Sequence, residues 1–177
     1  MTELFYDTKN LARFLVRNEL GARESLVFLR RVFREDREYL HPKLREQEKA
    51  FISGVLYWMD YLSDKETIDK EYPAIERDFT SMGHRLDRDH FHAEFPDLDM
   101  FFMSMRLELR FIRPRGYMRM KLRTLLKEYD HKRRSRKLIS HIRECIYFYH
   151  IQPFLRDQDE CDITEIALDD MIVFRVM

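Results

Sequence analysis

Residues 84–99, HRLDRDHFHAEFPDLD, contain three histidines and five carboxylates and are the first candidate for chemistry in this chain. Imidazole nitrogen and carboxylate oxygen are ligands that suit zinc, manganese or iron. In a helix His90 and His92 would point apart, because positions i and i+2 do not share a face, and only an extended loop would bring them together. Whether His84, His90 and His92 bind a metal is left open. We predict no metal ligand and no cofactor.

The segment that follows offers a second kind of metal chemistry. Some metal-dependent nucleases carry a Pro-Asp pair followed by a Glu-x-Lys motif. Here Asp97 follows a proline and Glu108-Leu109-Arg110 comes later in the chain, with arginine in place of the lysine. A helix over these residues would destroy the strand geometry that such a site needs. The chain also has no HExxH motif, no glycine-rich phosphate loop and no GxSxG elbow. We therefore predict that it is not an enzyme, and a metal-dependent nuclease or hydrolase remains the third hypothesis.

A basic segment near the middle of the C-terminal half is the other candidate site. The whole chain has 32 Lys+Arg and 32 Asp+Glu, so no global field attracts polyanions or membranes. Residues 115–143 nevertheless contain eleven basic and two acidic residues, a net of +9, whereas residues 144–177 have a net of −6. HKRRSRK, residues 131–137, lies inside the basic segment. A polyanionic partner must therefore be bound by this local patch.

Two amphipathic segments flank that basic run. Apolar residues at i, i+3, i+4 and i+7 predict a short helix from Leu122 to Tyr129. Ser135 is a suitable N-cap for a second helix. Its predicted buried face consists of Leu138, Ile142, Cys145, Ile146 and Tyr149, and its exposed stripe of Arg136, Ser140, Arg143 and Tyr147. This is the arrangement of a helix-turn-helix, in which the first helix braces the second and the second enters the major groove.

Eight residues of this region are predicted to contact nucleic acid. Phosphate contacts are assigned to Lys132, Arg133, Arg134, Arg136 and Lys137, and base contacts to Ser140, His141 and Arg143. The alternative is that the run is a solvated turn whose cations pair with the acidic tail.

The C-terminal tail, DITEIALDDMIVFRV, adds a predicted hairpin. It reads as two strands, residues 163–168 and 171–176, joined at Asp169-Asp170. With DMFFMSMRLELRFI as a first helix, residues 97–177 resemble winged-helix DNA-binding domains in their order of elements. The predicted turn of the helix-turn-helix contains no glycine, and the acidic RDQDECD, residues 156–162, would be repelled by phosphates.

The elements that must position these residues are predicted to be mainly α-helical. The chain has only four glycines and five prolines, and apolar residues recur at helical spacing through residues 4–20, 22–40, 44–62 and 68–86. We predict an N-terminal helical bundle, residues 1–95, that oligomerises or binds a protein partner. Residues 96–177 are predicted to form a winged-helix-like lobe that ends in a short β-hairpin.

These patterns favour a non-enzymatic DNA-binding protein, a transcriptional or mobile-element regulator that uses a basic helix-turn-helix and acts as a homodimer. The second hypothesis is a helical protein-interaction module that does not bind nucleic acid. No apolar run approaches the ~20 residues needed to span a bilayer, so no membrane partner is expected. The N-terminus does not read as a signal peptide and the two cysteines have no CxxC spacing, which predicts a cytoplasmic location.

Overall fold

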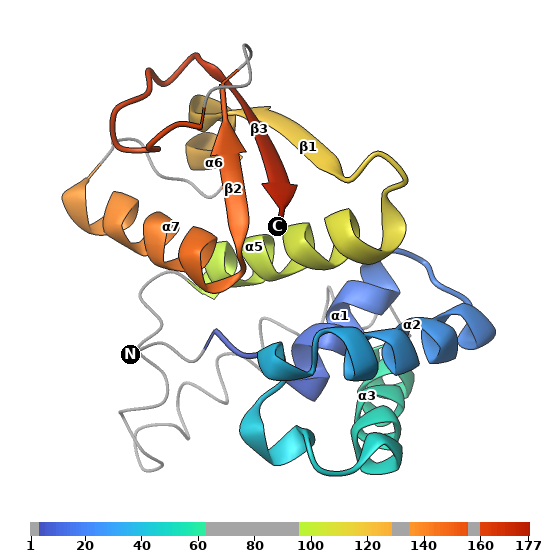
Figure 1. Ribbon diagram of the computed structural model, residues 1–177. Helices are drawn as coiled ribbons and strands as arrows, with labels where there is room; N and C mark the ends of the chain where they lie inside the picture. The colour runs from blue at the N-terminus through green and yellow to red at the C-terminus, as the bar shows by residue number, and fades with distance from the viewer. Residues whose placement is uncertain (1–3, 63–95, 129–134, 156–159) are drawn as a thin grey trace. The chain divides into compact units, whose positions relative to one another are not determined.

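The computed structural model describes residues 4–62, 96–128, 135–155 and 160–177. The chain divides into two compact units, Met1–Glu94 and Phe95–Met177. The described residues are mostly helical and include a three-stranded antiparallel sheet (Figure 1), which confirms the mainly α class. The predicted helix over residues 68–86 and the histidines of residues 84–92 lie outside the described residues. None of the described helices is long and apolar enough to cross a membrane.

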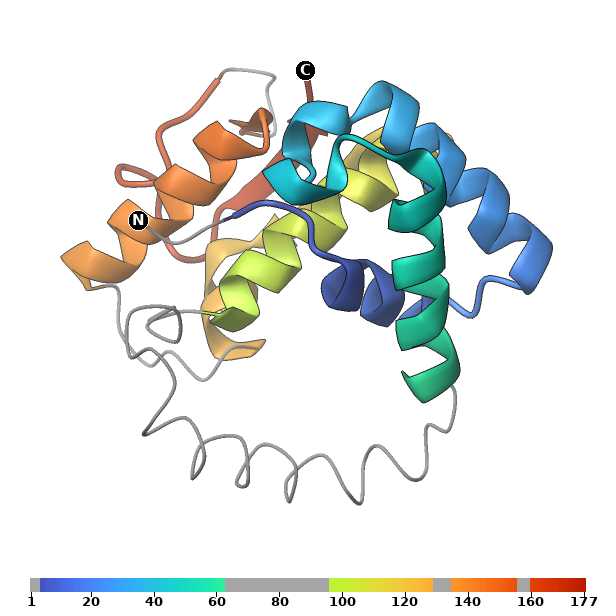
Figure 2. The same ribbon diagram turned by 90° about the horizontal axis from the view of Figure 1, so that it is seen from below.

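The first unit is helical throughout its described elements. These are α1 (Thr8–Arg17), α2 (Ala22–Glu35), the short 3-10 helices η1 (Arg37–Tyr39) and η2 (Pro42–Leu44), and α3 (Glu48–Leu62). Asp7 is the N-cap of α1, and its side chain accepts a hydrogen bond from the Asn10 backbone N–H at 2.7 Å. Helices α1 and α3 lie side by side (Figures 1 and 2). Stacking of Phe14 on Phe28 contributes to the core.

The second unit combines helices with the sheet. Its elements are α5 (Pro96–Leu107), the π-helical turn η3 (Glu108–Ile112), β1 (Tyr117–Lys121), α6 (Leu122–Glu128), α7 (Arg136–Phe148), β2 (Ile151–Phe154) and β3 (Met171–Val176). The sheet order is β1-β3-β2, with β3 antiparallel to both neighbours. Phe174 of β3 is fully buried and meets Phe102 of α5 edge-on at 6.4 Å between ring centroids. The core of this unit therefore lies between the central strand β3 and helix α5.

A buried polar contact ties α5 to the end of α7. Arg106 of α5 is 2% exposed, and its Nη1 donates a hydrogen bond to the backbone carbonyl of Tyr149 at 2.7 Å. Tyr149 is the C-cap of α7. A cationic donor at this end of a helix is favourable, because the last carbonyls lack partners within the helix and carry partial negative charge. The contact fixes where α7 ends relative to α5.

The predicted hairpin is partly wrong. The strand over residues 171–176 is confirmed as β3, but residues 163–168 form turns, and the hairpin partner of β3 is β2. Two aspartates explain the difference. The side chain of Asp162 accepts from the Thr164 backbone N–H, and that of Asp170 accepts from the Ala167 N–H, each at 2.8 Å. Such local bonds favour turns over a sheet ladder.

The N-cap of α7 provides a first test of how firmly this helix is held. Ser135 accepts a hydrogen bond from the Leu138 backbone N–H at 3.1 Å. Replacing Ser135 with alanine is expected to lower the free energy of unfolding by about 1 kcal/mol. Urea denaturation followed by circular dichroism measures the change. Ser140→Ala, in the exposed middle of the same helix, is the control and should not destabilise. Equal stability of the two variants would contradict a capping role.

Candidate functional site on helix α7

Helix α7 has one buried and one exposed face, as its sequence predicts. Four of the five residues predicted to be buried, Leu138, Ile142, Cys145 and Tyr149, are each at most 1% exposed, and the fifth, Ile146, is half-buried. The opposite stripe, Arg136, Ser140 and Arg143, is exposed, and Tyr147 at its end is 84% exposed. Spacings of three and four residues place the members of each set on one side of the helix. The helix therefore presents a cationic and hydroxyl-bearing surface to solvent.

The residues predicted to contact nucleic acid fall into three groups. Arg136, Lys137, Ser140 and Arg143 lie on the exposed side of α7. Lys132, Arg133 and Arg134 lie outside the described residues. His141 is the exception and is treated next.

The predicted exposure of His141 is wrong. This residue is 8% exposed, and its Nε2 lies 2.6 Å from Oδ1 of Asp99 on α5. The helical period explains the error, because His141 lies three residues after Leu138 and four before Cys145, both of which are buried. Its side chain belongs to the buried face of α7 and is not presented to a base.

Acidic residues border the C-terminal half of the exposed stripe. Arg143 pairs with Asp162 at 3.7 Å, although its side chain remains 60% exposed. A groove of about 580 Å³ lies beside this pair, with Tyr147 and Glu160 also in its wall. Carboxylates in the groove repel phosphates. The end of α7 that best suits an anionic ligand is therefore the N-terminal one, near Arg136.

A second ion pair removes one cation of α6 from the basic surface. Arg123 donates to both carboxylate oxygens of Asp169, at 2.8 and 2.7 Å. The pairing raises the pKa of Arg123 and lowers the pKa of Asp169. Both side chains are 60% exposed, so the pair adds little to stability. Its effect is to neutralise positive charge that the sequence would otherwise assign to α6.

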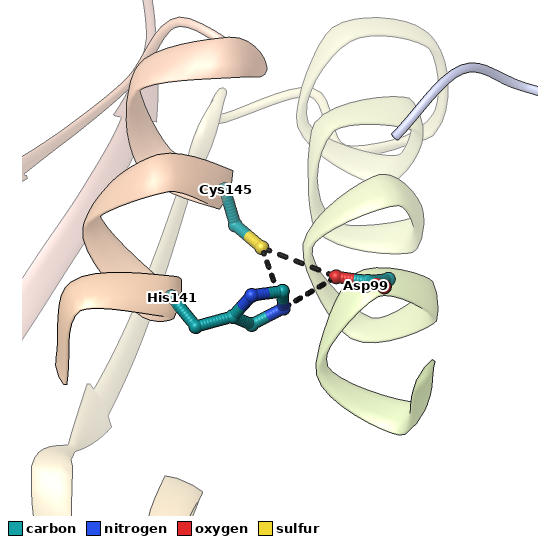
Figure 3. A group of neighbouring side chains, drawn as sticks. All are labelled: Asp99, His141 and Cys145. Carbon is teal, nitrogen blue, oxygen red and sulfur yellow. Dashed lines mark hydrogen bonds and ion pairs between the residues drawn. The ribbon is translucent and has the colours of Figure 1, made fainter. Parts of the chain in front are cut away.

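Beneath the exposed stripe, α5 and α7 bring together three side chains that carry chemistry (Figure 3). Oδ1 of Asp99 lies 2.6 Å from Nε2 of His141 and 3.5 Å from Sγ of Cys145. Sγ of Cys145 lies 3.7 Å from the same histidine nitrogen. A carboxylate oxygen only accepts, so the imidazole N–H and the thiol both donate to Asp99. All three donor or acceptor atoms face one point between the helices.

This geometry does not suit nucleophilic catalysis. A cysteine hydrolase uses both ring nitrogens of its histidine, one toward the thiol and the other toward the orienting side chain. Here Nε2 of His141 faces both Cys145 and Asp99. Cys145 is also fully buried, and this burial, reinforced by the charge of Asp99, raises the pKa of its thiol. The reactive thiolate is therefore disfavoured.

This cluster is not evident from the sequence. Its members are distant in the chain, since Asp99 precedes His141 by 42 residues and Cys145 by 46. Only the spacing of His141 and Cys145, at i and i+4 of a predicted helix, is a local signal for it. The sequence pattern separated that pair, because Cys145 was predicted on the buried face of the helix and His141 among the exposed base contacts.

Comparisons of the chain with protein-family models, with curated proteins and with solved structures found no match.

Proposed function

We propose that this protein binds DNA without catalysing a reaction, and that it acts as a transcriptional or mobile-element regulator. In this proposal the second unit is a winged-helix-like domain that inserts α7 into the major groove. The observation that carries the proposal is the exposed stripe of Arg136, Ser140 and Arg143 on a helix whose other face is buried. Arginine, serine and lysine side chains at this position supply contacts to phosphates and to base edges.

The order of elements in the second unit supports a winged-helix-like reading. Helix α5 is followed by β1, by the pair α6 and α7, and then by β2 and β3 in one antiparallel sheet. In this reading α5 and α6 brace α7, and the chain between β2 and β3 stands where a wing would be. The acidic Glu160 and Asp162 in that chain argue against wing contacts to phosphates. Recognition is therefore assigned to α7 alone.

A dimer would give this mode of binding enough contacts. One copy of α7 offers few phosphate contacts, and two copies related by a two-fold axis would double them on a symmetric site. The first unit is proposed to hold the two copies together.

A salt titration tests DNA binding directly. Fluorescence anisotropy of the full chain with a random-sequence duplex, repeated at several salt concentrations, should show affinity that falls steeply with salt. The expected log-log slope is about −0.9 for each phosphate neutralised. Binding through an uncharged apolar surface would instead give a log-log salt slope close to zero. Absence of binding at low salt, with the protein folded by circular dichroism, would overturn the proposal.

A helical protein-interaction module is the second candidate, and one observation favours it. Tyr57 and Tyr61 of α3 lie at i and i+4 and are 66% and 55% exposed. Exposed aromatic residues are enriched at protein interfaces. If this surface mediates self-association, Tyr57→Ser with Tyr61→Ser should reduce the dimer fraction in sedimentation experiments, and the wild type should not bind the DNA duplex even at low salt.

A further inference from the structure

We propose that Asp99, His141 and Cys145 form a binding site for one Zn²⁺ ion between α5 and α7. The site lies beneath the exposed face of α7 and goes beyond the proposed DNA contacts. Within the described part of the chain, these residues place one carboxylate oxygen, one imidazole nitrogen and one sulfur within 4.8 Å of one another. Figure 3 shows the three side chains converging from the two helices.

The distances are close to those of a tetrahedral zinc site. With Zn–S near 2.3 Å and Zn–N and Zn–O near 2.0 Å, tetrahedral angles place sulfur ~3.5 Å from either light ligand and nitrogen ~3.3 Å from oxygen. Sγ of Cys145 lies 3.5 Å from Oδ1 of Asp99 and 3.7 Å from Nε2 of His141. Two of the three separations therefore already match.

The third separation has to open when the metal enters. Nε2 of His141 and Oδ1 of Asp99 are 2.6 Å apart, a hydrogen-bond distance. On binding, zinc would take the place of the Nε2 proton, which would move to Nδ1 so that the imidazole stays neutral, and the Cys145 thiol would release its proton to solvent. The contact between Nε2 and Oδ1 would lengthen by about 0.7 Å. The side chains of His141 and Asp99 are 9% and 18% exposed, so a water molecule as fourth ligand has access from the side of Asp99.

The donor set and its charge favour zinc over other biological cations. Magnesium and calcium require oxygen ligands, whereas a thiolate with an imidazole and a carboxylate is a borderline-soft set that suits zinc. A thiolate and a carboxylate together carry two negative charges, which a divalent ion neutralises. Neutrality matters because an uncompensated charge is costly in a buried site. Three protein ligands and one water complete four-coordination.

Metal content and cobalt substitution test the site in the full chain. Protein purified without chelators should contain one zinc per chain at this site. After removal of zinc, Co²⁺ should give the visible absorption of a tetrahedral site and a near-ultraviolet band from thiolate-to-cobalt charge transfer, and added Zn²⁺ should abolish both. The wild-type spectrum reports thiolate ligation by itself, so this part of the test does not depend on a variant that folds.

Matched variants locate the site. Cys145→Ser should lose the charge-transfer band, and Asp99→Asn should weaken zinc binding more than roughly 100-fold, beyond the usual effect of losing an outer-shell partner. Cys161→Ser, the control at the other cysteine, should keep both properties. A variant with His84, His90 and His92 replaced by alanine should keep the charge-transfer band, which separates this site from metal bound at those histidines.

Three outcomes would overturn the proposal. The first is wild-type protein that binds neither zinc nor cobalt at micromolar concentration. The second is zinc binding that Cys161→Ser or the triple histidine variant removes, and that Cys145→Ser leaves intact. The third is stoichiometric iron or copper with no zinc. DNA binding is not part of this readout, so failure of the zinc site and failure of the proposed function are distinguishable.

Discussion

The double variant Arg136→Glu with Arg143→Glu is expected to bind random-sequence duplex DNA about 100-fold more weakly than the wild type. Both arginines lie on the exposed face of α7, seven residues apart and therefore on the same side of the helix. A hydrogen bond to a charged group contributes about 1.5–3 kcal/mol, so losing two of them at the lower end of that range, about 3 kcal/mol in total, gives a factor of this order. The magnitude of the log-log salt slope should also fall by about one, because Arg136 is the phosphate contact of the two and Arg143 is assigned to bases.

The control for this experiment is Arg30→Glu with Arg34→Glu on α2. This variant makes the same change in net charge, on two exposed arginines of one helix face in the other compact unit. It separates contact at α7 from the general effect of a more acidic protein. DNA affinity should remain within a few-fold of the wild type. An equal loss in both variants would show that net charge, and not the face of α7, determines binding.

The helices on either side of the basic run were predictable because each carries a complete local signal. The N-cap Ser135 specifies where α7 begins, and that prediction is confirmed. The apolar period of residues 138–149 specifies most of the buried face, since Leu138, Ile142, Cys145 and Tyr149 are buried, whereas Ile146 is half-buried and His141 was placed on the wrong side. Periodicity at 3.6 residues and a capping side chain are properties of neighbouring residues. Predictions from such local signals hold when the tertiary fold buries the same apolar residues that the periodicity identifies.

The sheet was less predictable, because its pairings join distant segments. Strand β2 is four residues long and contains Pro153, which has no N–H to donate and is a poor signal for a strand. The structure tolerates this proline because β2 is an edge strand of the three-stranded sheet. On its outer side it meets the chain at an isolated bridge between Phe154 and Glu160, and the Pro153 carbonyl accepts a hydrogen bond from the Cys161 backbone N–H. Strand β1, residues 117–121, was missed for a similar reason. It is short, and the alternation of its residues becomes meaningful only when β3 is known to lie beside it.

The Asp99–His141–Cys145 cluster needed the structure for a different reason. Sequence spacing predicts that His141 and Cys145 share a face, but it does not say which helix packs on that face or which of its residues meets them. That information comes from the packing of α5 on α7, together with the Arg106 bond to the end of α7. An ion or ligand site shared by two helices is a property of their packing and not of either sequence segment.

Replacing Phe174 with alanine is expected to destabilise the second unit by about 3–5 kcal/mol, the usual cost of removing a large aromatic side chain from a core. Phe174 is fully buried on the central strand β3 and packs edge-on against Phe102. A neighbour on each side, Met118 of β1 and Pro153 of β2, pairs with it in the sheet. Removing the ring would therefore leave a cavity where the sheet meets α5. The strands and the helix around this cavity hold one another in place, so they cannot move individually to fill it.

Hydrogen exchange measured by mass spectrometry resolves this loss to one unit of the chain. Peptides from α5 and β3 should exchange more than 100-fold faster in Phe174→Ala, because their amides open through unfolding of the unit that has been destabilised. Peptides from α3, in the other compact unit, serve as the internal reference. Phe154→Ala is the matched variant on the edge strand, where the ring is half-buried and Arg175 lies 5.3 Å from its centroid. It should cost only about 1 kcal/mol, and an equal effect of the two substitutions would refute a core centred on β3 and α5.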